Sequence, residues 1–277
     1  MSGLVEKRHL STRNFYVRAA SHRLFAQFIQ PDSEYTKKTP STLVFLHEGL
    51  GGIDQWRDFP ACLSSITGLP ALIYERWGYG SSDTLDTPRT SRYLHDEALI
   101  SLPEVLEHVH ISDAVLIGHS DGGSIALIFS AIHGDKVRGV ITEAAHVFVE
   151  DVTITGIRQA VELYETTDLK NRLRKFHKDN TDSMFRAWAD TWLAPWFRDW
   201  NIEEYLSRIS CPLLVIQGED DEYGTRAQVE SIVSQVAGPV EGLILPNCGH
   251  VPHNQARERV LKEMARFIGS LVHSDEI

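Results

Sequence analysis

The most informative part of the sequence is Gly118-His119-Ser120-Asp121-Gly122-Gly123. The apolar run from Ala114 to Ile117 precedes it and predicts a buried strand, and the run from Ser124 to Phe129 follows it and predicts a helix. A Gly-x-Ser-x-Gly pattern between a strand and a helix is typical of a nucleophile elbow, a sharp turn that projects the serine oxygen into a cleft. We therefore expect Ser120 to be a covalent nucleophile. The alternative is that Ser120 only caps the following helix.

The composition of the chain limits the classes of protein to which it can belong. The 277 residues, 42% of them hydrophobic, are enough to bury a core and suit one α/β domain with an insertion. The formal net charge is -11, and no run of Lys and Arg could follow a phosphate backbone, so we expect no nucleic-acid partner. No apolar run reaches the roughly 18 residues that cross a bilayer, and the N-terminus lacks a signal-peptide pattern. We expect a cytoplasmic protein without membrane association.

Short runs rich in Val, Ile and Leu alternate with helix-like stretches. Because these runs are continuously apolar, they predict strands covered on both faces, as in a parallel sheet. Near the N-terminus, residues 14–18 and 23–30 predict an antiparallel hairpin at the sheet edge. The expected fold class is α/β, with a mostly parallel central sheet and helices on both faces. The expected parallel strands are residues 43–47, 71–75, 114–118, 137–142, 213–217 and 240–245.

Residues 149–208 differ from the rest, because they lack a strand run and are predicted to form several helices. They stand between two predicted strands, so we expect a helical cap inserted between the core segments 1–148 and 209–277. Open α/β sheets bind ligands at the carboxyl edge of their strands, and a cap there would cover the site. Its aromatic residues are interpreted either as cap core or as pocket wall. They are Trp188, Trp192, Trp196, Phe197 and Trp200.

A serine nucleophile needs a neighbouring base, and the base needs an acid that fixes its tautomer. Both should follow Ser120 in the order Ser, Asp, His. The predicted strand 213–217 leads into a loop with four consecutive acids, where Asp221 completes a Gly-x-x-Asp pattern and Asp220 is the alternative. The loop after the last predicted strand carries His250 directly after a glycine. We expect His250 to be the base and Asp221 its orienting acid.

A metal site is the alternative for the histidine loop. His250 and His253 have the spacing of a metal-binding pair, but no third ligand stands at suitable spacing. The cysteines, Cys62, Cys211 and Cys248, show no Cys-x-x-Cys pattern and predict neither a disulfide framework nor a thiolate site. We expect no metal and no cofactor.

Acyl transfer also needs hydrogen-bond donors for the oxyanion. The predicted strand 43–47 runs into a glycine-rich turn, and we expect the backbone N–H groups of Glu48 and Gly49, with that of Asp121, to form the oxyanion hole. Side chains at the same sheet edge and on one face of a cap helix should line the substrate pocket. They are His47, Glu143, His146, Trp188 and Trp192.

On these motifs the chain resembles the α/β-hydrolase fold superfamily, in its capped branch of esterase-like and carbon–carbon-bond hydrolase-like enzymes. The likeness runs from Leu43 to Ile268. Two departures stand out: Glu48 replaces a glycine that often follows the first histidine, and Glu75 replaces an aspartate in the glycine-rich loop. Glu75 is interpreted as an ion-pair partner of Arg76 or a loop anchor. The motifs are His47-Glu48-Gly49-Leu50-Gly51, Glu75-Arg76-Trp77-Gly78-Tyr79-Gly80-Ser81-Ser82, the elbow at Ser120, Asp221 and His250.

The resemblance implies a serine hydrolase that cleaves a small carboxylic ester or thioester through an acyl-enzyme. The same triad also serves carbon–carbon-bond hydrolysis of ring-cleavage products, lactone opening and cofactor-free perhydrolysis. The non-enzyme alternative is a small-molecule receptor on the same fold. If two or more acids such as Glu48, Asp121 and Glu143 line the pocket, an anionic acyl group would be repelled.

Overall fold

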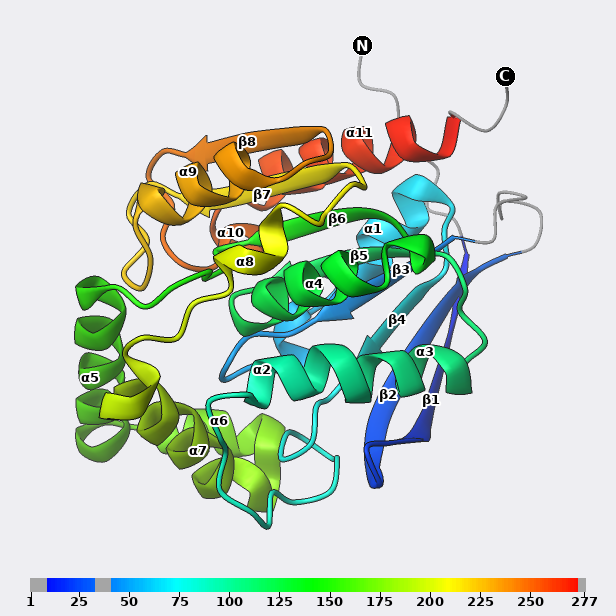
Figure 1. Ribbon diagram of the computed structural model, residues 1–277. Helices are drawn as coiled ribbons and strands as arrows, with labels where there is room; N and C mark the ends of the chain where they lie inside the picture. The colour runs from blue at the N-terminus through cyan, green and yellow to red at the C-terminus, as the bar shows by residue number, and fades with distance from the viewer. Residues whose placement is uncertain (1–8, 33–40, 274–277) are drawn as a thin grey trace.

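The computed structural model describes residues 9–32 and 41–273 and contains one eight-stranded sheet (Figure 1). The strand order is β1-β2-β4-β3-β5-β6-β7-β8. The pairs β1–β2 and β2–β4 are antiparallel, and all other neighbours are parallel. The predicted fold class is thereby confirmed. The strands are β1 (Leu10–Ala19), β2 (His22–Pro31), β3 (Thr42–Leu46), β4 (Ala71–Tyr74), β5 (Ala114–His119), β6 (Val137–Glu143), β7 (Leu213–Gly218) and β8 (Val240–Leu245).

The central strands are buried on both faces, which is why their sequences are continuously apolar. Along β3, Val44 and Leu46 pack into the core on one side of the sheet, and Leu43 and Phe45 pack into the core on the other side. This alternation follows from the two-residue period of a strand. At the sheet edge, the hairpin turn is Ala20-Ser21, both with positive φ, so the two strands are longer than predicted.

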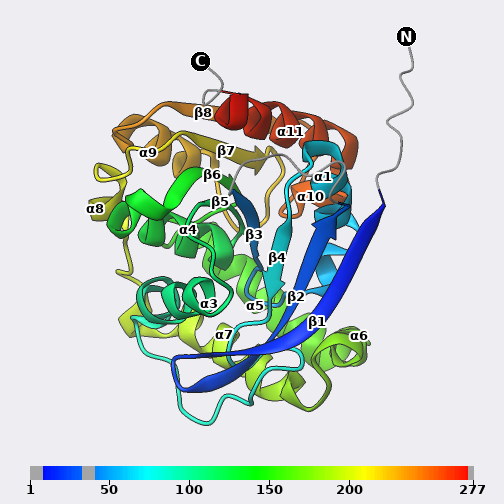
Figure 2. The ribbon, with the colours of Figure 1, turned by 90° about the vertical axis from the view of Figure 1, so that its right-hand side faces the viewer.

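Helices cover both faces of the sheet (Figure 2). The helices α1 and α11 pack together on one face, and α4 packs against β3, β5 and β6 on the other. The helices of this core are α1 (Phe59–Thr67), α2 (Tyr93–Asp96), α3 (Leu102–His108), α4 (Asp121–Ile132), α9 (Arg226–Gln235), α10 (Pro252–Gln255) and α11 (Arg257–His273), with the short helical turns η1 (Asp54–Trp56) and η3 (Gly134–Lys136).

Residues 93–108 do not form one continuous α-helix. The π-helical segment η2 (Glu97–Ser101) separates the two helices. Pro103 lies just beyond it and lacks the N–H that would donate to the carbonyl of Leu99, so regular α-helical bonding is interrupted here.

Apart from an isolated β-bridge between Phe148 and Asn201, the regular elements between β6 and β7 are all helical. The helices α5, α6 and α7 form a group apart from the sheet, at the lower left of Figure 1. The helix α8 instead contacts the core helices α4 and α9. The elements are α5 (Asp151–Thr166), α6 (Leu169–His177), η4 (Lys178–Asn180), α7 (Thr181–Leu193), η5 (Pro195–Phe197) and α8 (Glu203–Leu206).

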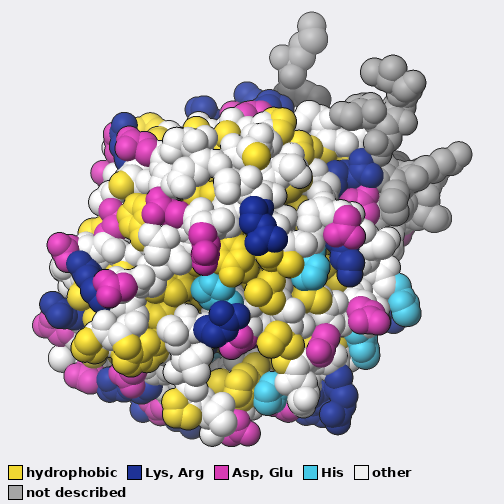
Figure 3. All heavy atoms as spheres, in the orientation of Figure 1, with side chains coloured by type: hydrophobic (Ala, Val, Ile, Leu, Met, Phe, Trp, Pro, Cys, Tyr) yellow, Lys and Arg dark blue, Asp and Glu magenta, His cyan; other side chains and the backbone are white. Residues whose placement is uncertain are grey.

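Acidic and basic side chains are interspersed on the face shown in Figure 3, without a broad zone of one sign. Within residues 9–32 and 41–273, none of the helices combines the length and the apolar character needed to cross a membrane.

Candidate active site

Ser120 lies in a sharp turn between β5 and α4, with φ 52 and ψ -116. A non-glycine residue rarely adopts positive φ, so the turn is strained. A Cβ at Gly118 would overlap the carbonyl of Gly122, and a Cβ at Gly122 would overlap the carbonyl of Leu46. Glycine at both positions therefore permits the close packing, while the N–H of Ser120 donates to the carbonyl of Glu143 at 2.8 Å.

His250 connects Ser120 with Asp221. Its Nε2 lies 3.0 Å from Ser120 Oγ, and its Nδ1 lies 2.8 Å from Asp221 Oδ1. An ionised carboxylate only accepts hydrogen bonds, so Nδ1 carries the proton and Nε2 is free to accept the serine proton. The structure thus brings together the three residues that the sequence placed in a triad.

The carboxylate of Asp221 is buried and held by several donors. It accepts hydrogen bonds from Gln217 Nε2 at 2.6 Å and from the N–H of Tyr223 at 2.8 Å. Burial alone would raise the pKa of Asp221, but the charge and hydrogen bond of His250, together with the hydrogen bond from the N–H of Tyr223, outweigh it and lower the pKa below its ordinary value. The neighbouring Asp220 is exposed, and it is not Asp220 but Asp221 that contacts the imidazole.

The glycine-rich turn after β3 lies beside the elbow. Among residues 9–32 and 41–273, none accepts a hydrogen bond from the backbone N–H of Gly49 or Asp121, whereas the N–H of Glu48 donates to its own carboxylate. The N–H groups of Gly49 and Asp121 are therefore available to a ligand, as an oxyanion hole requires. Buried Arg76 holds the turn, because its Nη2 donates to the carbonyl of Glu48 at 2.9 Å and lies 3.3 Å from Asp121 Oδ2.

The carboxylate of Asp121 is already partnered. Besides Arg76, it accepts a hydrogen bond from Tyr93 at 3.0 Å, and the Tyr93 hydroxyl accepts one from Trp192 Nε1 at 2.8 Å. This chain of hydrogen bonds runs from the cap helix α7 to the first residue of α4. Since Arg76 forms a buried ion pair with Asp121, the Asp121 charge is neutralised locally.

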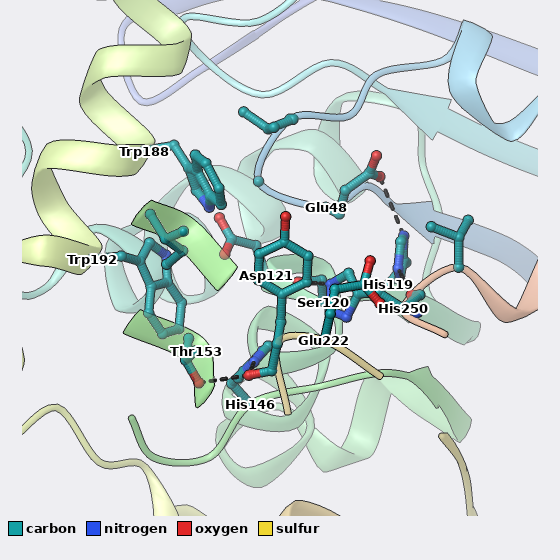
Figure 4. Close-up of a pocket in the computed structure, with 15 residues that line it drawn as sticks. Glu48, His119, Ser120, Asp121, His146, Thr153, Trp188, Trp192, Glu222 and His250 are labelled. Carbon is teal, nitrogen blue, oxygen red and sulfur yellow. Dashed lines mark hydrogen bonds and ion pairs between the residues drawn. The ribbon is translucent and has the colours of Figure 1, made fainter. Parts of the chain in front are cut away.

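A cavity of about 200 Å³ opens above Ser120 (Figure 4). Its wall combines residues from the ends of β3, β5, β7 and β8 with residues of α5 and α7. The insertion between β6 and β7 therefore covers the site. The lining residues are Glu48, Gly49, Leu50, His119, Ser120, Asp121, His146, Thr153, Ile157, Trp188, Trp192, Glu222, Tyr223, His250 and Val251.

Two residues expected in the pocket wall, His47 and Glu143, do not line the cavity. His47 is fully buried beneath it, where Nδ1 donates to the carbonyl of Glu48 at 2.8 Å and Nε2 accepts from the N–H of Arg76 at 3.1 Å. Glu143 is also fully buried, and its Oε2 lies 2.6 Å from His253 Nδ1. The side chains of both residues point away from the cavity.

Several lining residues were not expected from the sequence. His119 directly precedes the nucleophile, and Glu222 and Tyr223 directly follow Asp221, so adjacency was an available signal. Thr153 and Ile157 come from α5, one helical turn apart, and the sequence carried no signal that this face meets the site.

His146 was expected in the wall and lies there. Its Nε2 donates to the carbonyl of Tyr223 at 3.1 Å, which leaves Nδ1 as an acceptor. Burial and the neighbouring His250 lower the pKa of His146.

His253 does not complete a metal site. In the described part of the chain, no group of three or more His, Cys, Asp and Glu side chains has the arrangement to hold a metal ion.

The fold recurs in known proteins. A proline iminopeptidase of Saccharolobus solfataricus is 25% identical over 272 residues, which cover 84% of this chain and 86% of the relative. The structure of a proline iminopeptidase from Mycobacterium smegmatis has a TM-score of 0.73 and 17% identity, covering 94% of this chain and 98% of that one. An enol-lactonase from Burkholderia xenovorans LB400 has a TM-score of 0.71 and 19% identity, covering 92% and 100%.

At these identities the two solved structures establish the fold alone. The sequence model of the alpha/beta hydrolase family matches residues 43–263, most of the chain, and agrees with the resemblance seen in the motifs. The strained serine, the sheet beneath it and this match lead to one conclusion: the chain belongs to the alpha/beta hydrolase family.

Proposed function

We propose that the protein is a serine hydrolase that cleaves a small carboxylic ester or thioester through an acyl-enzyme. The observation that carries this proposal is the 3.0 Å contact between His250 Nε2 and Ser120 Oγ, with Asp221 on the other imidazole nitrogen. A serine with this support can lose its proton as it attacks a carbonyl carbon.

In the acylation step, Ser120 Oγ forms a bond to the carbonyl carbon and its proton passes to His250 Nε2. The oxyanion is held by the N–H groups of Asp121 and of the Glu48-Gly49 turn, each worth roughly 3 to 4 kcal/mol in the transition state. His250 then protonates the leaving oxygen or sulfur, which leaves an ester on Ser120. Water attacks this ester with His250 as the base, and Ser120 is restored.

The cavity wall bears on the substrate class. The carboxylates of Glu48 and Glu222 line the cavity, and His146 Nδ1 has no hydrogen-bond partner among the described residues. All three groups accept hydrogen bonds when Glu48 and Glu222 are ionised and His146 is neutral. We therefore expect a neutral or cationic acyl group to be preferred over an anionic one.

A second candidate, hydrolysis of an amide next to a free amine, is favoured by the carboxylate of Glu222. This acid lines the cavity and has no cationic partner among the described residues, so it fits a substrate ammonium group, and one relative of the chain is a proline iminopeptidase. A prolyl amide therefore belongs in the same substrate panel.

Active-site labelling and a substrate panel test the proposal together. A fluorophosphonate should label wild-type protein at Ser120 and fail to label Ser120→Ala, and the variant should lose at least about a thousandfold in turnover. The panel contains esters with neutral, acidic and basic acyl arms, a thioester, a lactone, a prolyl amide and a vinylogous diketo acid. Turnover of the diketo acid alone would favour carbon–carbon-bond hydrolysis. A folded protein whose Ser120 resists labelling would favour a receptor.

A further inference from the structure

Three carboxylate–imidazole pairs are packed together at the cavity, and only one of them has its imidazole hydrogen-bonded to Ser120. The ring of His119 lies between the other two imidazoles, with centroid distances of 5.1 Å to both His250 and His253. The proposed reaction uses one pair and leaves two unexplained. The pairs are Asp221 with His250, Glu48 with His119, and Glu143 with His253.

His119 is fully buried and has an acceptor at each ring nitrogen. Its Nε2 lies 2.7 Å from the carbonyl oxygen of His250, and its Nδ1 lies 3.3 Å from Glu48 Oε2. A carbonyl oxygen cannot donate, and an ionised carboxylate cannot either. A neutral imidazole donates from one nitrogen only, so both contacts are hydrogen bonds only when the Glu48–His119 pair holds an additional proton.

The surroundings favour placing that proton on His119. The titratable groups packed around the ring are Glu48, Glu143, His250 and His253. Burial opposes a charge on His119, but the hydrogen bond and charge of Glu48 outweigh it and raise the pKa of His119 to about 9. Burial likewise opposes ionisation of Glu48, yet His119 holds the pKa of Glu48 below its ordinary range.

The position of Glu48 in the site means that the Glu48–His119 pair connects several parts of the site. Glu48 belongs to the turn that carries the proposed oxyanion donor Gly49, and its carboxylate lies over Gly51, where a Cβ would overlap it. His250 belongs to the loop after β8. His119 ends β5 and immediately precedes the nucleophile. One side chain therefore joins the oxyanion turn, the elbow and the catalytic-histidine loop.

We propose that His119 is a positioning residue which, by donating from both ring nitrogens, ties the Glu48 turn to the His250 loop and so fixes the oxyanion hole and the base around Ser120. The inference rests on the proposed serine mechanism and adds a residue pair to it. Loss of the second proton would free one loop from the other and misplace groups that must act together.

The first test is the pH dependence of turnover of a small neutral ester. As pH rises through about 9, wild-type kcat should fall while KM changes little, because His119 can then donate to only one acceptor.

In Glu48→Gln, the amide N–H can donate to Nδ1 of His119 while Nε2–H still donates to the carbonyl of His250. Whatever its kcat at pH 7.5, the variant should lose the fall near pH 9. His119→Phe removes both bonds and should lower kcat about 100-fold.

Glu222→Gln is the matched control. It removes a carboxylate from the same cavity, and that carboxylate accepts from the backbone N–H of His250 at 3.2 Å without contacting His119. Its profile should keep the fall near pH 9 whatever its effect on kcat. An unchanged fall in Glu48→Gln would overturn the proposal.

The second test does not depend on activity. Nitrogen-15 NMR of the wild-type protein should show protons on both ring nitrogens of His119 at pH 7.5 and release of one near pH 9. The signals are assigned by their change in Glu48→Gln and, if it folds, by their absence in His119→Phe. A single protonated nitrogen at pH 7.5 would refute the proposal. If Ser120→Ala retained turnover, the serine mechanism would fail, but the spectra would still report on His119.

Discussion

Asp221 Oδ1 lies 2.8 Å from His250 Nδ1, although 28 residues separate the two in the chain. The contact forms because β7 and β8 are parallel neighbours, so the loops that follow them leave the same edge of the sheet. The carboxylate is itself fixed by the N–H of Tyr223, in the turn that follows it. Because Asp221 is held in place by its own turn, it fixes the orientation of the His250 imidazole.

We expect Asp221→Asn to lower kcat by about 10⁴-fold, because an amide can hold the imidazole in the wrong tautomer while preserving its place. Steady-state kinetics on the best ester of the panel measure the effect. Asp220→Asn is the control, since this neighbouring acid is exposed, and its kcat should stay near that of the wild type. Equal losses in both variants would contradict the role given to Asp221.

The site residues that could be predicted from the sequence are those that stand in a short motif directly after a predicted strand. Ser120 and Asp221 follow buried apolar strands within a few residues, and His250 follows the edge strand β8, which is less buried than the predicted cover on both faces implies. Parallel strands bring their carboxyl ends to one edge. In the structure, His250 lies within hydrogen-bonding distance of both Asp221 and Ser120.

The direction of side chains at the strand ends could not be predicted in the same way. Glu143 is the register partner of His119 across β5 and β6, so both side chains project to one side of the sheet, where Glu143 contacts His253. A one-residue change in that register would turn Glu143 to the other side. The sequence places the residue at the edge but does not settle the register.

The aromatic series of the cap shows a similar limit. Trp188 and Trp192 line the cavity, whereas Trp196 is 54% exposed. Their spacing puts the first two on one helix face, but only the packing of α7 over the sheet decides which face meets the cavity.

Tyr93 links the cap to the elbow, and its removal should weaken that link. In Tyr93→Phe, buried Trp192 Nε1 loses its acceptor and Asp121 loses a donor. We expect unfolding free energy to fall by about 1 to 3 kcal/mol, measured by urea denaturation. Tyr205→Phe keeps the ring and removes a hydroxyl that makes no hydrogen bond within the described ranges, so its midpoint should not move. A stable Tyr93→Phe would show that the link contributes little.

Glu75 should make stability depend on pH. It is not the partner of Arg76 but a loop anchor, whose Oε2 accepts from the N–H of Ser81 at 2.6 Å, while Arg76 pairs with Asp121. Burial raises the pKa of Glu75 to about 7 from 4.5. Because the folded value is the higher one, the contribution of Glu75 to stability is full below pH 4.5 and is lost as pH rises through about 7.

Glu75→Gln cannot ionise, so its unfolding free energy should lack this decline. Relative to wild type, the unfolding free energy of the variant should increase with rising pH, by about 3 kcal/mol between pH 4.5 and pH 8. Urea denaturation of both proteins across this range measures the difference. Parallel curves would show that Glu75 is not protonated in the folded protein near neutral pH.

Gly49 lets the helix α7 approach the proposed oxyanion turn, and this contact should control turnover. A Cβ at Gly49 would overlap the indole Nε1 of Trp188, whereas a Cβ at Gly134 would have no heavy atom within 4 Å. Gly49→Ala should therefore displace the turn or the indole and lower kcat/KM by about 100-fold, while Gly134→Ala should leave kcat/KM unchanged.

A double variant tests whether Gly49→Ala acts through Trp188 or through the backbone of the turn. In Gly49→Ala with Trp188→Ala, the obstacle to the new methyl group is gone, so kcat/KM should return to the value of Trp188→Ala alone. If the two losses simply add, the methyl group acts through the backbone of the turn and not through the tryptophan. The contact between Gly49 and Trp188 would then be incidental to catalysis.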